Sequence, residues 1–170
     1  MSSKLNWFVW ALTIVVATIH LVWWYPQLPD IVPAHFNGSG QVDSEMTKSG
    51  FCLLIAGIQL MTLVGLPLLG SILKQLPDSL VNMPNREYWL APERREASLA
   101  VNYQMLLATA WLTGVLMMVI FELSAQVAMK RRTGIHPEMW IALAVYLVLV
   151  FGMCGWSFYW FRLPEKAQAS

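Results

Sequence analysis

Four side chains suited to acid–base or metal chemistry lie within one short segment of the sequence: Asp30, His35, Asp43 and Glu45. Carboxylates and an imidazole can bind zinc, or can act together as acid and base. Structural zinc sites need four ligands at tight spacing, whereas these four are scattered. We therefore expect no metal site, and interpret the four as solvated loop charges or as part of a surface that binds a ligand or partner.

The rest of the chain offers little catalytic chemistry. It contains no G-x-S-x-G, no H-E-x-x-H and no Ser–His pair at helical spacing, so we predict neither an enzyme nor a cofactor. His20 is expected to be an interfacial packing residue. Cys52 and Cys154 lie in apolar runs and are expected to be small buried hydrophobic residues.

The segment that carries the four polar side chains, residues 25–50, cannot be a helix. Pro26, Pro29 and Pro33 fix their own φ angles and remove backbone donors, and residues 37–40 (Asn-Gly-Ser-Gly) are typical of a turn. A segment of this length is too short to form a core of its own. We therefore predict a constrained, non-helical loop that lies on the ends of helices.

The elements that must position this loop are apolar. Hydrophobic residues make up 57% of the 170 residues and charged residues 12%, too few to cover a soluble fold. A helix of about 20 apolar residues spans a bilayer, and four apolar runs reach that length, the third at about residues 98–121. The helices that contain them are predicted at about residues 5–24, 51–73, 92–129 and 137–161. The fold class predicted is all-α: one polytopic membrane domain, four transmembrane helices in a small bundle.

Prolines, glycines and charges predict where these helices bend and end. Pro67 lies inside the second run, so a kink is expected near Leu63. Pro92 and Glu93 fit the first turn of the third helix. Basic residues 130–132, followed by Gly134, fit its C-terminus, and Pro137 opens the fourth helix.

The helices carry few unusual groups. The polar residues within them are expected to form interhelical hydrogen bonds, although they could also line a pathway: Gln59, Thr62, Asn102, Thr109 and Thr113. Glu122 is placed at the end of the third run, near the interface. No charge lies at the centre of a run, which argues against an ion-coupled transporter.

The segment at residues 74–91, the second loop, is expected to lie on the same side of the membrane as both termini. That side carries seven basic residues, Lys4, Lys74, Arg86, Arg94, Arg95, Arg162 and Lys166. The other side carries four, Lys48, Lys130, Arg131 and Arg132. The positive-inside rule therefore predicts cytoplasmic termini. The net charge of +1 argues against nucleic-acid binding.

Both loops also carry motifs. The first loop reads Leu28-Pro29-Asp30-x-x-Pro33-x-His35-Phe36-Asn37-x-x-Gly40-x-x-Asp43 and closes with Lys48. It resembles the family called domain of unknown function 1648 (DUF1648), which also forms the N-terminal part of SdpI-type immunity and signalling proteins. Val42 and Glu45 stand where that family often has a proline and an aromatic residue. Asn82-x-Pro84-Asn85-Arg86-x-Tyr88-Trp89-Leu90 looks like a second motif common in such proteins.

The resemblance implies a bacterial plasma-membrane protein of poorly defined biochemistry. We expect a small membrane sensor, immunity-like protein or interaction protein whose partners are the bilayer and a peptide or protein. Residues expected to bind a ligand or partner are Pro29, Asp30, Pro33, His35, Phe36, Asn37, Gly40, Asp43 and Lys48. Residues of a cytoplasmic docking loop would be Asn82, Pro84, Asn85, Arg86, Tyr88, Trp89, Glu93 and Arg94, unless that loop only anchors the third helix. The alternatives are a small transporter or pore and a purely structural or assembly role.

Overall fold

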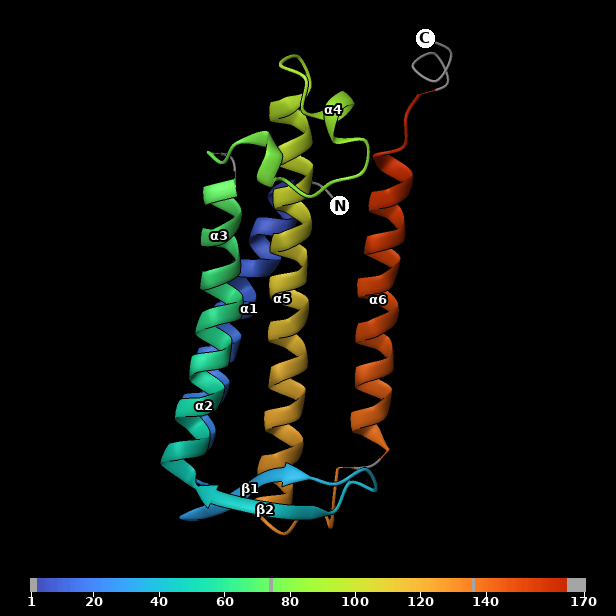
Figure 1. The fold of residues 1–170 in the computed structure, drawn as a ribbon. Helices are drawn as coiled ribbons and strands as arrows, with labels where there is room; N and C mark the ends of the chain where they lie inside the picture. The colour runs from blue at the N-terminus through green and yellow to red at the C-terminus, as the bar shows by residue number, and fades with distance from the viewer. Residues whose placement is uncertain (1–2, 74, 136, 165–170) are drawn as a thin grey trace.

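A computed structural model describes residues 3–73, 75–135 and 137–164 of the chain. It contains four helical segments long and apolar enough to cross a membrane: α1 (Ser3–Trp24), the segment Lys48–Ile72, α5 (Arg95–Ala128) and α6 (Glu138–Trp160). They run up and down along one common direction (Figure 1). The chain is therefore an all-α polytopic membrane protein.

The longest helix, α5, organises the others. It packs against α1, α3 (Leu66–Leu73) and α6, and also against the first strand of a hairpin described below. Its 34 residues span about 51 Å, which exceeds the thickness of a hydrocarbon core by about 20 Å. The second loop and the short helix α4 (Arg86–Trp89) lie around the N-terminal end of α5, at one end of the molecule (Figure 1).

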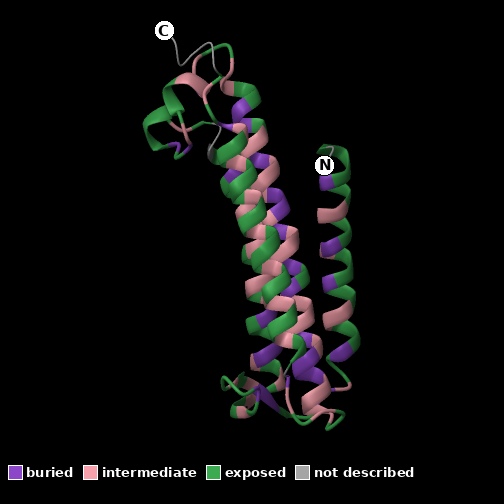
Figure 2. Cartoon of the chain, turned by 90° about the vertical axis from the view of Figure 1, so that its right-hand side faces the viewer, coloured by how far each residue is buried: buried purple, intermediate pink, exposed green. Residues whose placement is uncertain are grey.

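The apolar exterior of the bundle fits a lipid environment. No residue of α6 is buried, although this helix is almost entirely apolar; Val148 and Phe151, for example, are 70% and 69% exposed. Figure 2 shows buried positions gathered on the inward faces of the helices and exposed positions along their outward faces. In water this surface would be unfavourable, whereas hydrocarbon solvates it.

The first loop folds as a β-hairpin, which is more regular than the loop expected from its prolines and turn residues. Strands β1 (Ile31–Phe36) and β2 (Val42–Thr47) pair antiparallel, with Ile31 opposite Thr47 and Pro33 opposite Glu45. The register shifts on either side of His35. The hairpin lies across one end of the bundle, opposite the second loop and the described termini (Figure 1).

A hydrophobic cluster fixes the hairpin to the helices. Leu28 and Val32 are buried beside Trp24 of α1, Phe51 of α2 (Lys48–Leu60) and Phe121 of α5. Phe51 and Phe121 stack with ring centroids 5.5 Å apart. Burying such side chains stabilises by roughly 1.5–3 kcal/mol each, so the hairpin is held to three helices rather than hanging from its two ends.

Pro67 produces a local change of helix type. Between α2 and α3, residues Met61–Gly65 form a π-helical turn, in which the amide of Leu66 donates to the carbonyl of Met61. Pro67 cannot donate to the carbonyl of Leu63, four residues earlier. The indole Nε1 of Trp10 donates to that oxygen instead, at 2.7 Å. Near Leu63, where a kink was expected, the helix thus has a π-helical turn, and Trp10 of α1 bonds to the carbonyl that Pro67 leaves without a donor.

Several local expectations were wrong. The third transmembrane helix begins at Arg95, three residues after Pro92. It ends at Ala128. Two residues later Lys130 takes the left-handed conformation (φ 55°), so the helix stops before Gly134, which was expected to follow its end. Cys52 is buried as expected, but Cys154 is exposed on α6.

The polar helix residues divide between two roles. Thr113 reaches Tyr146 of α6 at 3.0 Å, and the amide nitrogen of Gln59 donates to the carbonyl of Gly114 at 3.1 Å, so these two link helices as expected. Thr62 and Thr109 donate to carbonyls of their own helices instead. Serine and threonine hydroxyls often bond to the preceding turn, which sequence alone does not distinguish from an interhelical bond.

Candidate functional site

The most specific residues of the first motif build the turn of the hairpin. The side-chain oxygen of Asn37 accepts hydrogen bonds from the amide and hydroxyl of Ser39 and from the amide of Gln41, at 2.8–3.0 Å. Gly40 has φ 77°, a conformation that favours glycine. Asn37 and Gly40 therefore determine the backbone conformation of the turn, which we call the hairpin tip (residues 37–41).

The tip is docked onto the linker between α5 and α6. The amide of Ile135 donates to the carbonyl of Gly40 at 3.1 Å, and a Cβ on Gly134 would overlap that same oxygen. Beside this contact is an open cavity of about 380 Å³ between the tip and the first turns of α6. Its lining combines motif residues with apolar ones: His35, Phe36, Asn37, Gly38, Gly40, Ile135, Met139, Trp140 and Leu143.

The charged residues of the first loop separate into two pairs. His35 Nδ1 lies 2.6 Å from a carboxylate oxygen of Asp43, and both side chains are well exposed. Lys48 lies 3.2 Å from Asp30 at the base of the hairpin, where its amide also donates to the Asp30 carbonyl. Glu45 is exposed on β2. Within the described ranges, no three His, Cys, Asp or Glu side chains converge to hold a metal ion.

The remaining first-motif residues have structural positions. Pro33 is buried in β1, opposite Glu45. Phe36 pairs with Val42 at the end of the strands, and Pro29 precedes them at an exposed position. The structure thus brings together His35, Phe36, Asn37, Gly40 and Asp43 near the tip, while Pro29, Asp30 and Lys48 lie at the base.

The second motif holds the end of α6. The amide nitrogen of Asn85 and the indole nitrogen of Trp89 both donate to the carbonyl of Phe161, at 2.8 and 2.7 Å. Phe161 is fully buried, in a cluster with Val81 and Leu90. Asn85 has φ 51°, a left-handed conformation that asparagine tolerates better than most residues.

The arginines in the second loop and just after it bond to groups of that loop. Arg86 donates to the carbonyl of Ser79, and Arg94 donates to that of Tyr88 while its guanidinium lies 4.1 Å from the Tyr88 ring centre. Arg95 pairs with Asp78 at 2.9 Å. Exposed side chains on this side include Asn82, Glu87 and Glu93, while Pro84 is half-buried in the turn. An open cavity of about 670 Å³ lies along residues 79–88.

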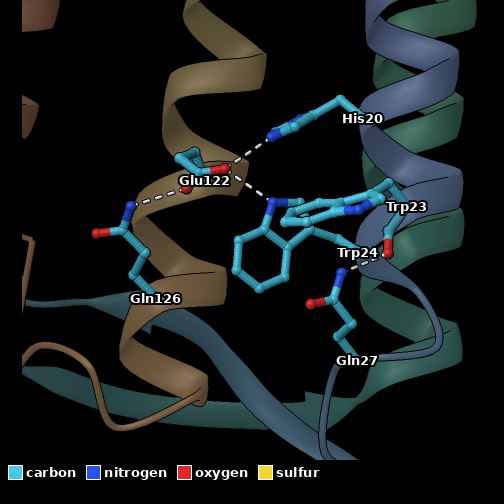
Figure 3. Close-up of polar contacts among 6 residues, drawn as sticks. All are labelled: His20, Trp23, Trp24, Gln27, Glu122 and Gln126. Carbon is cyan, nitrogen blue, oxygen red and sulfur yellow. Dashed lines mark hydrogen bonds and ion pairs between the residues drawn. The ribbon is translucent and has the colours of Figure 1, made fainter.

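A polar cluster that sequence analysis missed joins α1 to α5 on the bundle side of the hairpin (Figure 3). One carboxylate oxygen of Glu122 accepts from His20 Nε2 and from Trp24 Nε1, each at 2.8 Å. The other accepts from Gln126 Nε2 at 2.7 Å. Glu122 lies six residues before the end of α5, so this is an acidic group whose hydrogen bonds come from two membrane-spanning helices.

The sequence contained a signal for this cluster. His20 and Trp24 are four residues apart near the end of the first apolar run, and Glu122 and Gln126 have the same spacing near the end of the third. Residues at this spacing share one helix face. Because the first and third helices are parallel, the two polar pairs lie at similar depth. Treated separately, His20 and Glu122 appeared to be interfacial residues.

Comparison with known proteins gives one match. A family model described as "Domain of unknown function (DUF1648)" matches residues 12–60. The match begins within α1, contains the whole hairpin and ends at the last residue of α2. No curated protein and no solved structure matches the chain. The second motif and Glu122 lie outside the matched region.

Proposed function

Because the chain carries the domain of unknown function DUF1648 over residues 12–60, we propose that the hairpin at the centre of this region is a recognition element. The chain would then be a small membrane sensor or immunity-like interaction protein. Its ligand would be an extended peptide segment outside the cell, which adds as a third strand to β2. The relationship to SdpI-type proteins, and the bacterial plasma membrane as location, are parts of this proposal.

The observation that carries the proposal is the outer edge of β2, which pairs with no further strand among the described residues. The sheet has two strands, and Asp43, Ser44 and Glu45 on β2 are exposed. Peptides bind such edges by main-chain hydrogen bonds, with side-chain pockets giving specificity. Because β1 packs on α5 and its side chains are partly buried, β2 is the strand left for a partner.

The register identifies the backbone groups available to a partner. The amide of Lys48 bonds to the carbonyl of Asp30, and hydrogen-bonded positions alternate along an antiparallel pair. Val32 and Met46 are therefore the next bonded pair, whereas Pro33 and Glu45 are a non-bonded pair. Pro33 fits there because no amide is needed. Across from it, the Glu45 N–H points to the outer edge.

Side chains at the tip would supply specificity. The cavity beside the tip is lined by Phe36 and Trp140 as well as by His35, so it can take an apolar side chain next to a polar group. His35 is bonded to Asp43 on the neighbouring strand, which orients its ring. The positive-inside count of seven basic residues against four supports an outward-facing hairpin.

A proline at Glu45 tests this proposal. Protein in nanodiscs would be used to select binders from a displayed library of random linear peptides. Glu45→Pro removes the outward amide but leaves the β1–β2 ladder intact, and Glu45→Ala is the matched control. Selected peptides should bind Glu45→Ala like the natural protein and Glu45→Pro at least tenfold more weakly. Equal binding to both variants, or no enrichment at all, would contradict strand addition.

A further inference from the structure

A second cavity lies inside the membrane-spanning part of the molecule, away from the hairpin tip. It has a volume of about 260 Å³ and is formed by α1, by α2 with the π-helical turn, and by α5. Ala17, Ile55, Leu63 and Phe121 are buried residues of its lining, while Val22 and Leu60 are exposed and face the lipid. Its wall is apolar apart from three side chains, Thr18, His20 and Gln59.

Gln59 contributes an acceptor that has no donor. Its Nε2 donates to the carbonyl of Gly114, which fixes the orientation of the amide because a carbonyl can only accept. Its Oε1 is buried and has no hydrogen-bond partner within the described part of the chain. Buried polar atoms are rarely left unpaired, and hydrocarbon offers no donor. An occupant of the cavity is the natural source of the missing hydrogen.

His20 contributes a second acceptor. Its Nε2 lies 2.8 Å from the Glu122 carboxylate and must carry the proton of that hydrogen bond when the carboxylate is ionised. In the neutral ring Nδ1 is then an acceptor, and none of the described residues donates to it. Gln59 bonds to Gly114 and His20 bonds to Glu122, which are eight residues apart on α5, so the two acceptors lie about two helical turns apart along the cavity wall.

We propose that this cavity binds a single-chain amphiphile carrying a hydroxyl group, which enters from the membrane. Its aliphatic chain would lie against Ala17, Leu63 and Phe121, and its hydroxyl would donate to Gln59 or His20. An ordinary phospholipid chain would fill the space but satisfy neither acceptor. The chemistry required is therefore that of a long-chain alcohol, and this site does not depend on peptide binding at the hairpin.

Photolabelling in nanodiscs tests the proposal. The probe is 1-hexadecanol with a diazirine in mid-chain, and the matched probe is its methyl ether, which keeps the chain but cannot donate. The alcohol should label residues 14–22 and 55–64, with competition by excess 1-hexadecanol, and the ether should label them at least fivefold less. Equal labelling by both probes, or labelling spread evenly over α6 as well, would overturn the proposal.

Four variants distinguish the hydrogen-bond acceptor of Gln59 from the volume of the cavity. Gln59→Leu should reduce labelling by the alcohol to the level of the ether. Ala17→Phe should fill the cavity and abolish labelling by both probes, and Ala56→Phe serves the same purpose if that variant does not fold. Val15→Phe, on the exposed side of α1 outside the cavity, should label like the natural protein. Undiminished labelling in the filled variants would also overturn the proposal.

Discussion

The two ends of the molecule use their polar residues differently. At the end with the second loop, Asn85 and Trp89 bond to α6, and three arginines bond within the loop or at the start of α5. At the hairpin end, Asn37 and Gly40 also build structure, but His35, Asp43 and Glu45 remain exposed. Motif residues at both ends thus shape the backbone and exposed polar groups remain at both, but among the described residues only the hairpin end also offers a strand edge.

This difference separates anchoring from recognition. An exposed strand edge offers a row of main-chain groups to a partner, whereas the bonds made by the arginines in and just after the second loop hold that loop together. We therefore interpret the second loop as an anchor for α5 and α6, and the hairpin as the binding element. The cytoplasmic docking role considered for the second loop stays a prediction.

The largest expected effect is at the contact that holds the hairpin tip. Gly134→Ala places a methyl group against the Gly40 carbonyl and should destabilise the protein by about 2 kcal/mol, because backbone must move. Gly38→Ala, one residue from Asn37 but in open space, should change the unfolding free energy by less than about 0.5 kcal/mol. Unfolding in mixed micelles measures both; equal effects would mean that the tip is not docked.

Glu122 provides a test of how α1 and α5 are joined next to the hairpin. Glu122→Ala leaves three donors on His20, Trp24 and Gln126 without their acceptor and should cost about 2 kcal/mol. Glu122→Gln retains an acceptor oxygen and should cost about half as much. The same unfolding assay applies, and an alanine variant as stable as the natural protein would show that the cluster adds nothing to stability.

The bond between Trp10 and the π-helical turn can be isolated by a double-mutant cycle. Trp10→Phe removes the donor to the Leu63 carbonyl and should cost about 1 kcal/mol. In a Pro67→Ala background the residue at position 67 regains an N–H that can reach that carbonyl, so the same change should cost much less. Equal costs in both backgrounds would exclude this compensation.

The smallest effect on stability is expected at the His35–Asp43 pair, where the effect on peptide binding should be large. His35→Ala combined with Asp43→Asn removes an exposed pair and should change the unfolding free energy by less than about 0.5 kcal/mol. The same variant should bind selected peptides several-fold more weakly, as measured by fluorescence anisotropy in nanodiscs. Unchanged peptide affinity would remove the His35–Asp43 pair from the recognition surface.

Much of the fold could be predicted from sequence because lipid imposes simple rules. Apolar length identified the four spanning segments, and Pro67 located the irregularity in the second helix. The hairpin was anticipated only as a non-helical loop, since its strands are short and interrupted by Pro33. The Glu122 cluster and the unpaired Oε1 of Gln59 depend on which helices pack against each other. Neither composition nor spacing within one helix determines which helices are neighbours.

The proposed recognition of an external peptide requires the hairpin to be exposed outside the cell and the second loop to face the cytoplasm. Cysteine labelling in intact cells tests it most directly, with Cys52→Ala and Cys154→Ala as background. A membrane-impermeant maleimide should label Ser39→Cys at the hairpin tip without permeabilisation, and Asn82→Cys in the second loop only after it. Labelling of Asn82→Cys but not Ser39→Cys in intact cells would reverse the orientation and contradict the account.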